Sequence, residues 1–168
     1  MAMALAGCGG SSGTSPAAYV KSVCTTLGKW SSSIRTASSR LQSASTGATS
    51  LANGKQQYVA FIRALVSDTD TAVSRLKDAG APNIKNGKQI SSTLVSTFTQ
   101  AKAGLSNAAS EATRIPVSSA AAYQAGASGV SIQIRQTLSQ MAGVAPERDP
   151  QLRAAATKDA ACRALRNS

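Results

Sequence analysis

The sequence predicts an all-α protein: an antiparallel up-down-up-down four-helix bundle with a short extra C-terminal helix. Apolar residues recur in alternating steps of three and four along four long segments. Proline, glycine or Asn-Gly interrupts this pattern between the segments, and no long alternation of strand type competes with it. Four amphipathic helices joined by short loops bury their apolar stripes most economically against one another. The 168 residues fit a single helical domain, which we expect over residues 16–168.

The composition is basic and poor in large aliphatic side chains. Lys and Arg number 18 against 7 Asp and Glu, and histidine is absent, which gives a formal net charge of +11. High net charge with few large apolar residues is typical of disordered chains. The helical periodicity outweighs this signal, because the abundant alanine favours helix and lets neighbouring helices approach closely.

The first two helices have clear signals at their outer ends. Ser15-Pro16 combines an N-cap residue with proline at the first helical position. The pattern is lost over residues 47–54, where Asn53-Gly54 predicts a loop, and the second helix ends at Gly80 and Pro82. The first predicted seam comprises Val20, Val23 or Cys24, Leu27, Trp30, Ile34, Ala37, Leu41 and Ala44, and the second Tyr58, Ile62, Leu65, Thr69, Ala72, Leu76 and Ala79. Trp30, the single tryptophan, is therefore expected in the core.

The second half of the chain repeats this design. The third helix is expected to start between Asn83 and Lys88 and to stop at Pro116, and Ser118 is expected to cap the fourth. Residues 150–166 are read as one short terminal helix. The third seam comprises Leu94, Phe98, Ala101, Leu105, Ala108, Ala112 and Ile115, and the fourth Tyr123, Ala127, Val130, Ile134, Leu138 and Met141.

The N-terminal stretch Leu5-Ala6-Gly7-Cys8 resembles the lipobox of bacterial lipoproteins, followed by a Gly/Ser-rich run to Ser15. The resemblance implies a lipid attached to Cys8, a flexible tether over residues 1–15 and a location on the outer side of the membrane, either anchored or secreted. Only seven uncharged residues precede Cys8, fewer than a signal peptide needs, so we expect this start to be truncated, trimmed or wrongly assigned. The alternative is a chance match in a chain rich in alanine and glycine.

The cysteine count is odd, which in an exported protein indicates that one cysteine has a separate role. If Cys8 carries lipid, Cys24 and Cys162 remain as a pair near the two ends of the helical region. An even number of long helices returns the chain to the end where it began, so the terminal helix should lie beside the start of the first. We therefore predict a disulfide between Cys24 and Cys162, the alternative being two buried free thiols.

Catalytic groups are scarce. The absence of histidine excludes a Ser-His-Asp triad, a Cys-His pair and histidine-liganded metal sites, and no phosphate-binding glycine motif is present. Asp68 and Asp70 lie two positions apart on a predicted helix, so their side chains point about 200° apart and cannot share a metal ion. We expect no catalytic residue, no cofactor and no metal site, with both carboxylates on a solvated face.

The basic side chains are dispersed along the chain, with one local concentration. Arg153, Lys158, Arg163 and Arg166 give the predicted terminal helix a positive face beside the tethered end. Anionic lipid headgroups or phosphate-bearing wall polymers are possible contacts for it, and the alternative is a charge that only maintains solubility. Lys85 and Lys88 are expected in a loop far from the tether. Nucleic acid is disfavoured, because export would remove that partner and few aromatic residues are available for stacking.

Taken together, the lipobox-like Cys8, the Gly/Ser tether, the two remaining cysteines and the stretch 76–87 between two helices resemble the small secreted lipoproteins of high-GC Gram-positive bacteria. The resemblance carries over no activity and no catalytic residue. It favours a non-catalytic, lipid-anchored bundle that binds a protein or another component of the cell envelope. The alternative function is a carrier that holds an apolar small ligand between the bundle helices.

Overall fold

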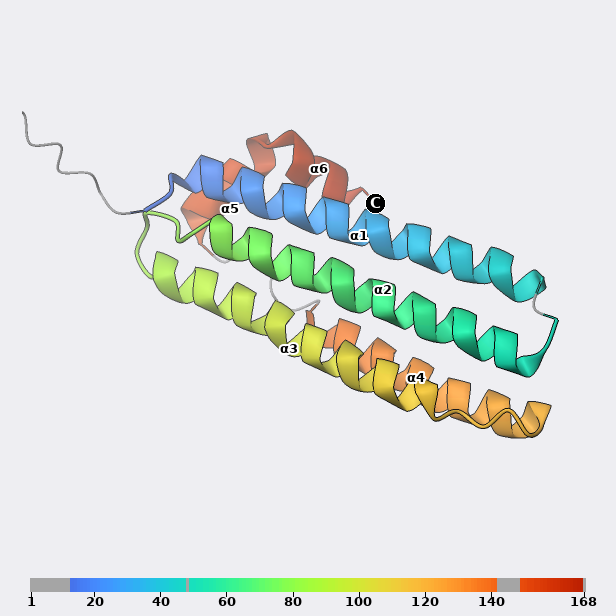
Figure 1. The fold of residues 1–168 in the computed structure, drawn as a ribbon. Coiled ribbons are helices and arrows are strands. Elements are labelled where there is room, and N and C mark those ends of the chain that lie inside the picture. The colour runs from blue at the N-terminus through green and yellow to red at the C-terminus, as the bar shows by residue number, and fades with distance from the viewer. Residues whose placement is uncertain (1–12, 48, 142–148, 168) are drawn as a thin grey trace, which may run out of the picture.

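The computed structural model describes residues 13–47, 49–141 and 149–167, and these residues form six helices. Four are long and run alternately up and down the molecule, which confirms the predicted fold class (Figure 1). Apart from one isolated bridge between Thr14 and Pro82, the described part contains no β-structure. The helices are α1 (Pro16–Thr46), α2 (Leu51–Asp78), α3 (Gly87–Thr113), α4 (Ala120–Met141), α5 (Pro150–Lys158) and α6 (Ala160–Arg166).

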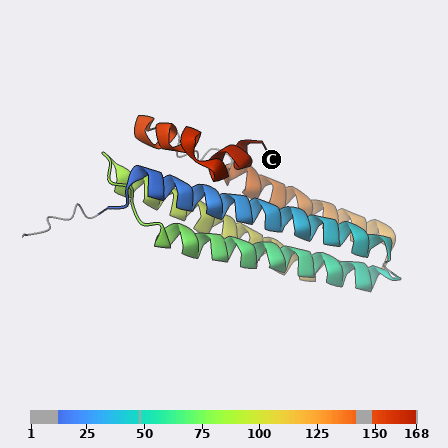
Figure 2. The same cartoon turned by 90° about the horizontal axis from the view of Figure 1, so that it is seen from above.

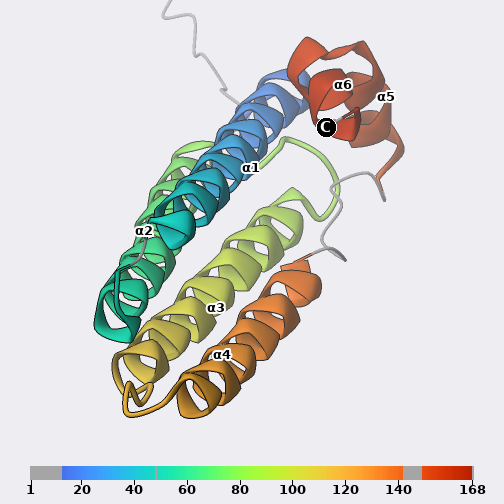
Figure 3. The same cartoon turned by 90° about the vertical axis from the view of Figure 1, so that its right-hand side faces the viewer.

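Helices that follow one another in the chain lie side by side: α1 on α2, α2 on α3 and α3 on α4 (Figure 3). The short helices α5 and α6 pack on α1 and on each other. Both lie along the N-terminal half of α1, on its side away from α2 (Figures 1 and 2). Within the described residues, no helix is both long and apolar enough to cross a membrane.

The core consists of two clusters, one toward each end of the bundle. The cluster at the N-terminal end joins α1, α2 and α3 to α5 and α6, with Leu76, Phe98 and Leu152 among its members. The cluster at the other end is centred on Ile62 and Leu105, both fully buried, and includes residues of α4. Every seam residue predicted for α2 and α3 is buried, so the three-four periodicity identified the inner faces of these helices correctly.

Local capping explains where helix boundaries differ from the sequence prediction. The predicted loop at Asn53-Gly54 is wrong, because the Ser50 hydroxyl accepts a hydrogen bond from the Asn53 N–H at 3.2 Å and starts α2 at Leu51. The N-cap interaction of the fourth helix comes from Ser119, whose hydroxyl accepts from the Ala122 N–H at 3.2 Å, instead of from Ser118. In both places a serine supplies the acceptor that the first turn needs.

The C-terminal region forms two helices in place of the single one predicted. Asp159 lies between them with extended backbone, where its own N–H bonds to the Ala155 carbonyl and ends α5. Its carboxylate accepts a hydrogen bond from the Cys162 N–H at 3.0 Å and so begins α6. Asp149 caps α5 in the same way, accepting from Gln151 and Leu152. Asp149 therefore sets where this segment begins, and Asp159 creates the corner that divides it into two helices.

Small residues bring α3 and α4 into close contact. A Cβ atom added to Gly104 of α3 would lie 2.7 Å from the hydroxyl oxygen of Thr137 in α4, and one added to Gly126 of α4 would lie 3.1 Å from Ile115. The seam thus uses glycine, as well as the expected alanine, to fit the larger side chains of the facing helix.

Candidate functional site

The structure brings Cys24 of α1 and Cys162 of α6 together. Their sulfur atoms lie 1.98 Å apart, at disulfide distance, and the residues are separated by 138 positions in the sequence. Both cysteines are buried within the cluster at the N-terminal end of the bundle. The predicted return of the chain to its starting end therefore occurs, and it places the two thiols opposite each other. Cys8, the predicted lipid attachment site, lies outside the described residues.

The C-terminal helices cover the first turns of α1. Leu152 and Ala156 of α5 are buried in the same cluster as Tyr19, Val20 and Val23. Burying this apolar area removes it from water and stabilises the attachment of α5 and α6, in addition to the disulfide. The C-terminal segment is therefore attached to α1 both by buried apolar contacts and by the disulfide.

Thr14 fixes the point at which the chain enters the bundle. Its N–H donates to the Ala81 carbonyl at 2.9 Å, and its carbonyl accepts from the Asn83 N–H at 2.8 Å. Its hydroxyl donates to the carbonyl of Ala79 at 2.9 Å. Three hydrogen bonds therefore hold Thr14, a residue expected within the tether, against the connection between α2 and α3.

This attachment corrects the predicted place of Lys85 and Lys88. They were expected far from the tether, but both belong to the segment from Ala79 to Lys88 that begins where Thr14 is bound. The reason is topological, because α2 runs back along α1 and returns the chain to the end where α1 starts (Figure 1). Both lysines are exposed. We call Lys85 and Lys88 the tether-side lysines.

The four predicted C-terminal contact residues do not form one face of one helix. Arg153 and Lys158 belong to α5 and Arg163 and Arg166 to α6, and all four are exposed. The Arg163 guanidinium donates to the carbonyls of Thr157 at 3.3 Å and Lys158 at 2.9 Å. This side chain therefore supplies hydrogen-bond donors to backbone carbonyls at the C-terminal end of α5. We call these four residues the C-terminal basic set.

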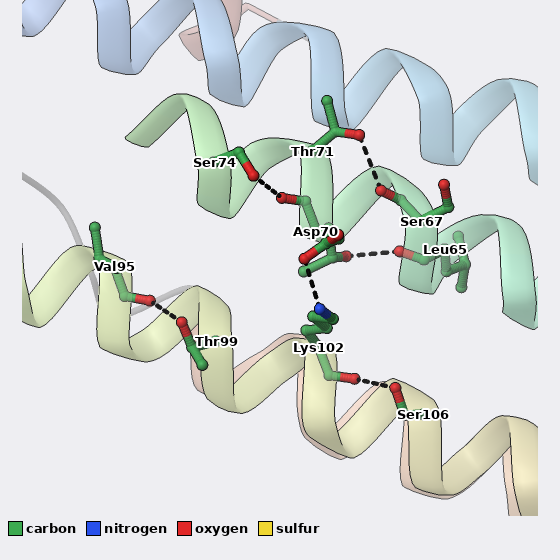
Figure 4. Close-up of polar contacts among 10 residues, drawn as sticks. Leu65, Ser67, Asp70, Thr71, Ser74, Val95, Thr99, Lys102 and Ser106 are labelled. Atoms are coloured by element: carbon green, nitrogen blue, oxygen red, sulfur yellow. Dashed lines mark hydrogen bonds and ion pairs between the residues drawn. The ribbon is translucent and has the colours of Figure 1, made fainter. Parts of the chain in front are cut away.

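Several of the few carboxylates cap helices or form ion pairs on the surface. They are too few to neutralise the excess of Lys and Arg. Asp149 and Asp159 cap helices, and Glu111 lies 3.7 Å from Arg114 in the same turn. Asp70 of α2 pairs with Lys102 of α3 at 2.6 Å on an exposed surface (Figure 4). The sequence of α1 contains no carboxylate at all, although it carries Lys21, Lys29, Arg35 and Arg40. Exposed ion pairs such as Asp70–Lys102 and Glu111–Arg114 contribute little to stability.

Sequence reasoning placed the tether-side lysines at the wrong end of the bundle, although counting the passes of an up-down bundle would have placed them correctly. It also missed a groove between α1 and α2, to which no motif pointed. Among the described residues, no group of three or more cysteine and carboxylate side chains converges as a metal site would require. No family model, no curated protein and no solved structure matches the chain.

Proposed function

We propose that this protein is a non-catalytic binding protein, held at the outer face of a membrane through a lipid on Cys8. The observation that carries the proposal is the attachment of Thr14 to the connection between α2 and α3. It fixes which end of the bundle an anchor at Cys8 would hold at the membrane. That end presents the tether-side lysines, and α5 and α6 lie beside it (Figure 1).

Chain length supports this orientation. The six peptide steps from Cys8 to Thr14 span at most about 20 Å. The 31 residues of α1 extend about 46 Å from that point. An anchored bundle would therefore keep Lys85 and Lys88 near the headgroups and carry the opposite end away from the bilayer. Each lysine or arginine near an anionic membrane surface contributes about 1 kcal/mol of attraction, which fades within a screening length of about 8 Å.

Lipid attachment is tested by expressing the chain behind a complete lipoprotein signal sequence in place of residues 1–7. The expected product carries diacylglycerol on Cys8 by mass spectrometry and sediments with membranes. Cys8→Ala is expected to move it to the soluble fraction. A Cys8→Ala variant that stays in the membrane fraction would contradict the anchor.

The charge contribution is tested with the unlipidated chain and vesicles containing an anionic phospholipid, at about 0.15 M salt. Lys85→Glu/Lys88→Glu is compared with Arg40→Glu/Arg63→Glu, which changes the net charge equally toward the opposite end of the bundle. We expect the first pair to weaken binding about tenfold and the second less than about twofold. Charge reversal across the C-terminal basic set is expected to act like the first pair. Equal losses from both pairs would identify a diffuse solubility charge.

The alternative function, a carrier of an apolar ligand, draws less support from the inner faces of the bundle. The rings of Trp30 and Phe98 meet edge to face at 5.3 Å, and Gly104 lies directly against Thr137. Close contacts of this kind occupy the space that a ligand between the helices would need. These contacts support our proposal that the protein binds its partner through the outer surface of the bundle.

A further inference from the structure

A polar groove of about 400 Å³ runs along the surface between α1 and α2. The groove is open to solvent along its length, and its volume lies within the range of small-molecule sites. Its walls are one stripe of each helix, with Thr26, Lys29 and Trp30 from α1 and Asp68, Thr71 and Arg75 from α2. Thr71, which lines the groove, lies on the side of α2 that faces α1, whereas Asp70 points to Lys102 of α3 (Figure 4).

Trp30 is held rigidly at this groove. Its indole N–H donates to the Thr69 hydroxyl at 3.1 Å, and its ring packs edge to face on Phe98 with an interplanar angle of 69°. The side chain is only partly buried, so part of it lines the groove. A fixed aromatic surface offers a ligand apolar contact without loss of side-chain entropy on binding.

Three charged groups of the groove have no internal partner. Among the described residues, no hydrogen bond or ion pair engages the side chains of Asp68, Lys29 or Arg75. Asp68 is partly buried, whereas Asp70, two positions along the same helix, is exposed and paired with Lys102. Asp68 and Arg75 are seven residues apart, which places them about 10 Å from each other along the axis of α2. The groove therefore presents an acceptor toward one end of its α2 wall and the cation of Arg75 toward the other, with Lys29 on the α1 wall.

We propose that this groove binds a short saccharide that carries a carboxylate or another anionic group. The C–H face of a sugar ring would pack on Trp30, and Asp68 would accept hydrogen bonds from ring hydroxyls. Thr71 donates its own proton to the Ser67 carbonyl at 3.0 Å, so its oxygen is left as an acceptor. Arg75 and Lys29 would hold the anionic group through charge-assisted hydrogen bonds.

This ligand class deepens the proposed binding function and rests on it, but it does not depend on the anchor at Cys8. The assay uses the unlipidated chain in solution, so membrane attachment can fail while saccharide binding succeeds, or the reverse. Because Trp30 is the only tryptophan, its emission reports directly on the groove.

The experiment titrates trigalacturonate against the protein and follows Trp30 emission, with calorimetry as a second readout. Galactotriose is the uncharged control of the same length. Polygalacturonate distinguishes recognition of a polymer from that of a free oligosaccharide. We expect saturable binding of the acidic sugar and weaker binding of the neutral one. Asp68→Asn and Arg75→Gln are each expected to weaken binding about tenfold, the effect of one lost charge-assisted hydrogen bond.

The controls change the same residue types on the same helix outside the groove. Asp70→Asn and Arg63→Gln are expected to leave the affinity unchanged, and circular dichroism checks that every variant remains folded. The proposal is overturned if trigalacturonate gives no saturable change, if galactotriose binds equally well, or if the control variants weaken binding as much as the groove variants.

Discussion

The indole N–H of Trp30 in α1 donates a hydrogen bond of 3.1 Å to the hydroxyl oxygen of Thr69 in α2. Thr69 is fully buried, and its own proton goes to the Leu65 carbonyl at 2.7 Å. One hydroxyl therefore acts as donor within its helix and as acceptor between two helices. It is a polar link between α1 and α2 within a mostly apolar core.

Replacing Thr69 by valine tests this link. The substitution keeps the shape of the side chain but leaves the partly buried indole N–H without an acceptor, so we expect the free energy of unfolding to fall by about 1–3 kcal/mol. Urea unfolding followed by Trp30 emission measures the loss. Thr99→Val removes a comparable bond to the i−4 carbonyl at an exposed position and should cost much less. Equal losses would contradict the role of the interhelical bond.

The second prediction concerns the covalent link between α1 and α6. Replacing both Cys24 and Cys162 by alanine should lower the free energy of unfolding by about 2–5 kcal/mol, because the bond closes a long loop in the unfolded chain. Thermal unfolding measures this loss, and Cys8→Ala serves as the control without effect. Peptide mapping under nonreducing conditions should recover Cys24 joined to Cys162. A peptide joining Cys8 to either residue would disprove this pairing.

The third prediction tests the inner faces of α2 and α3. Leu105 and Ile62 are fully buried, so Leu105→Asp or Ile62→Asp places an unpaired charge in the core and should unfold the protein. Far-UV circular dichroism should then lose its helical signal. Ala103→Asp adds the same charge to the exposed side of α3 and should leave the signal intact.

The fourth prediction uses one substitution at two glycines. Gly129 of α4 has open space where a Cβ would lie, so Gly129→Ala should stabilise the helix by about 0.5–1 kcal/mol. Gly104→Ala gains the same helix propensity but places its Cβ 2.7 Å from the Thr137 hydroxyl, so we expect a net loss of about 1–3 kcal/mol. Chemical denaturation measures both. Stabilisation by Gly104→Ala would show that α3 and α4 are not in close contact there.

The fifth prediction concerns alkaline pH. Burial raises the pKa of Tyr19 above the usual 10.0, and the Ser91 side chain partly offsets this rise. Burial also raises the pKa of Tyr58, against the opposing effect of its hydrogen bond with Ser131. A pKa raised in the folded state favours the neutral phenol, so this stability is fully present below about pH 10 and is lost as the pH rises through the folded-state values.

In the double variant Tyr19→Phe/Tyr58→Phe, the free energy of unfolding should therefore fall less steeply with pH between about pH 9 and about pH 11. Guanidinium titrations of both proteins across this interval measure the two slopes. Identical slopes would show that other groups cause the alkaline loss.

The sequence predicted the helical fold and the inner residues of α2 and α3, because long segments with a three-four pattern have only one inner face. It failed at Ser50 and Asp159, where one capping side chain decides whether a helix starts or breaks. The groove beside Trp30 was not predictable either. Asp68 and Asp70 look alike in the sequence, and only the placement of α1 and α3 on different sides of α2 separates a groove carboxylate from a paired surface one.

The bond between Cys24 and Cys162 also makes a covalent ring of almost the whole bundle, since 138 positions separate its ends. A protease that cuts once inside this ring, for example between α3 and α4, would leave two fragments still joined. The nicked molecule should migrate as one band without reductant and as two with it. Its core contacts would remain in place, so a single cleavage need not separate the two pieces or unfold the bundle.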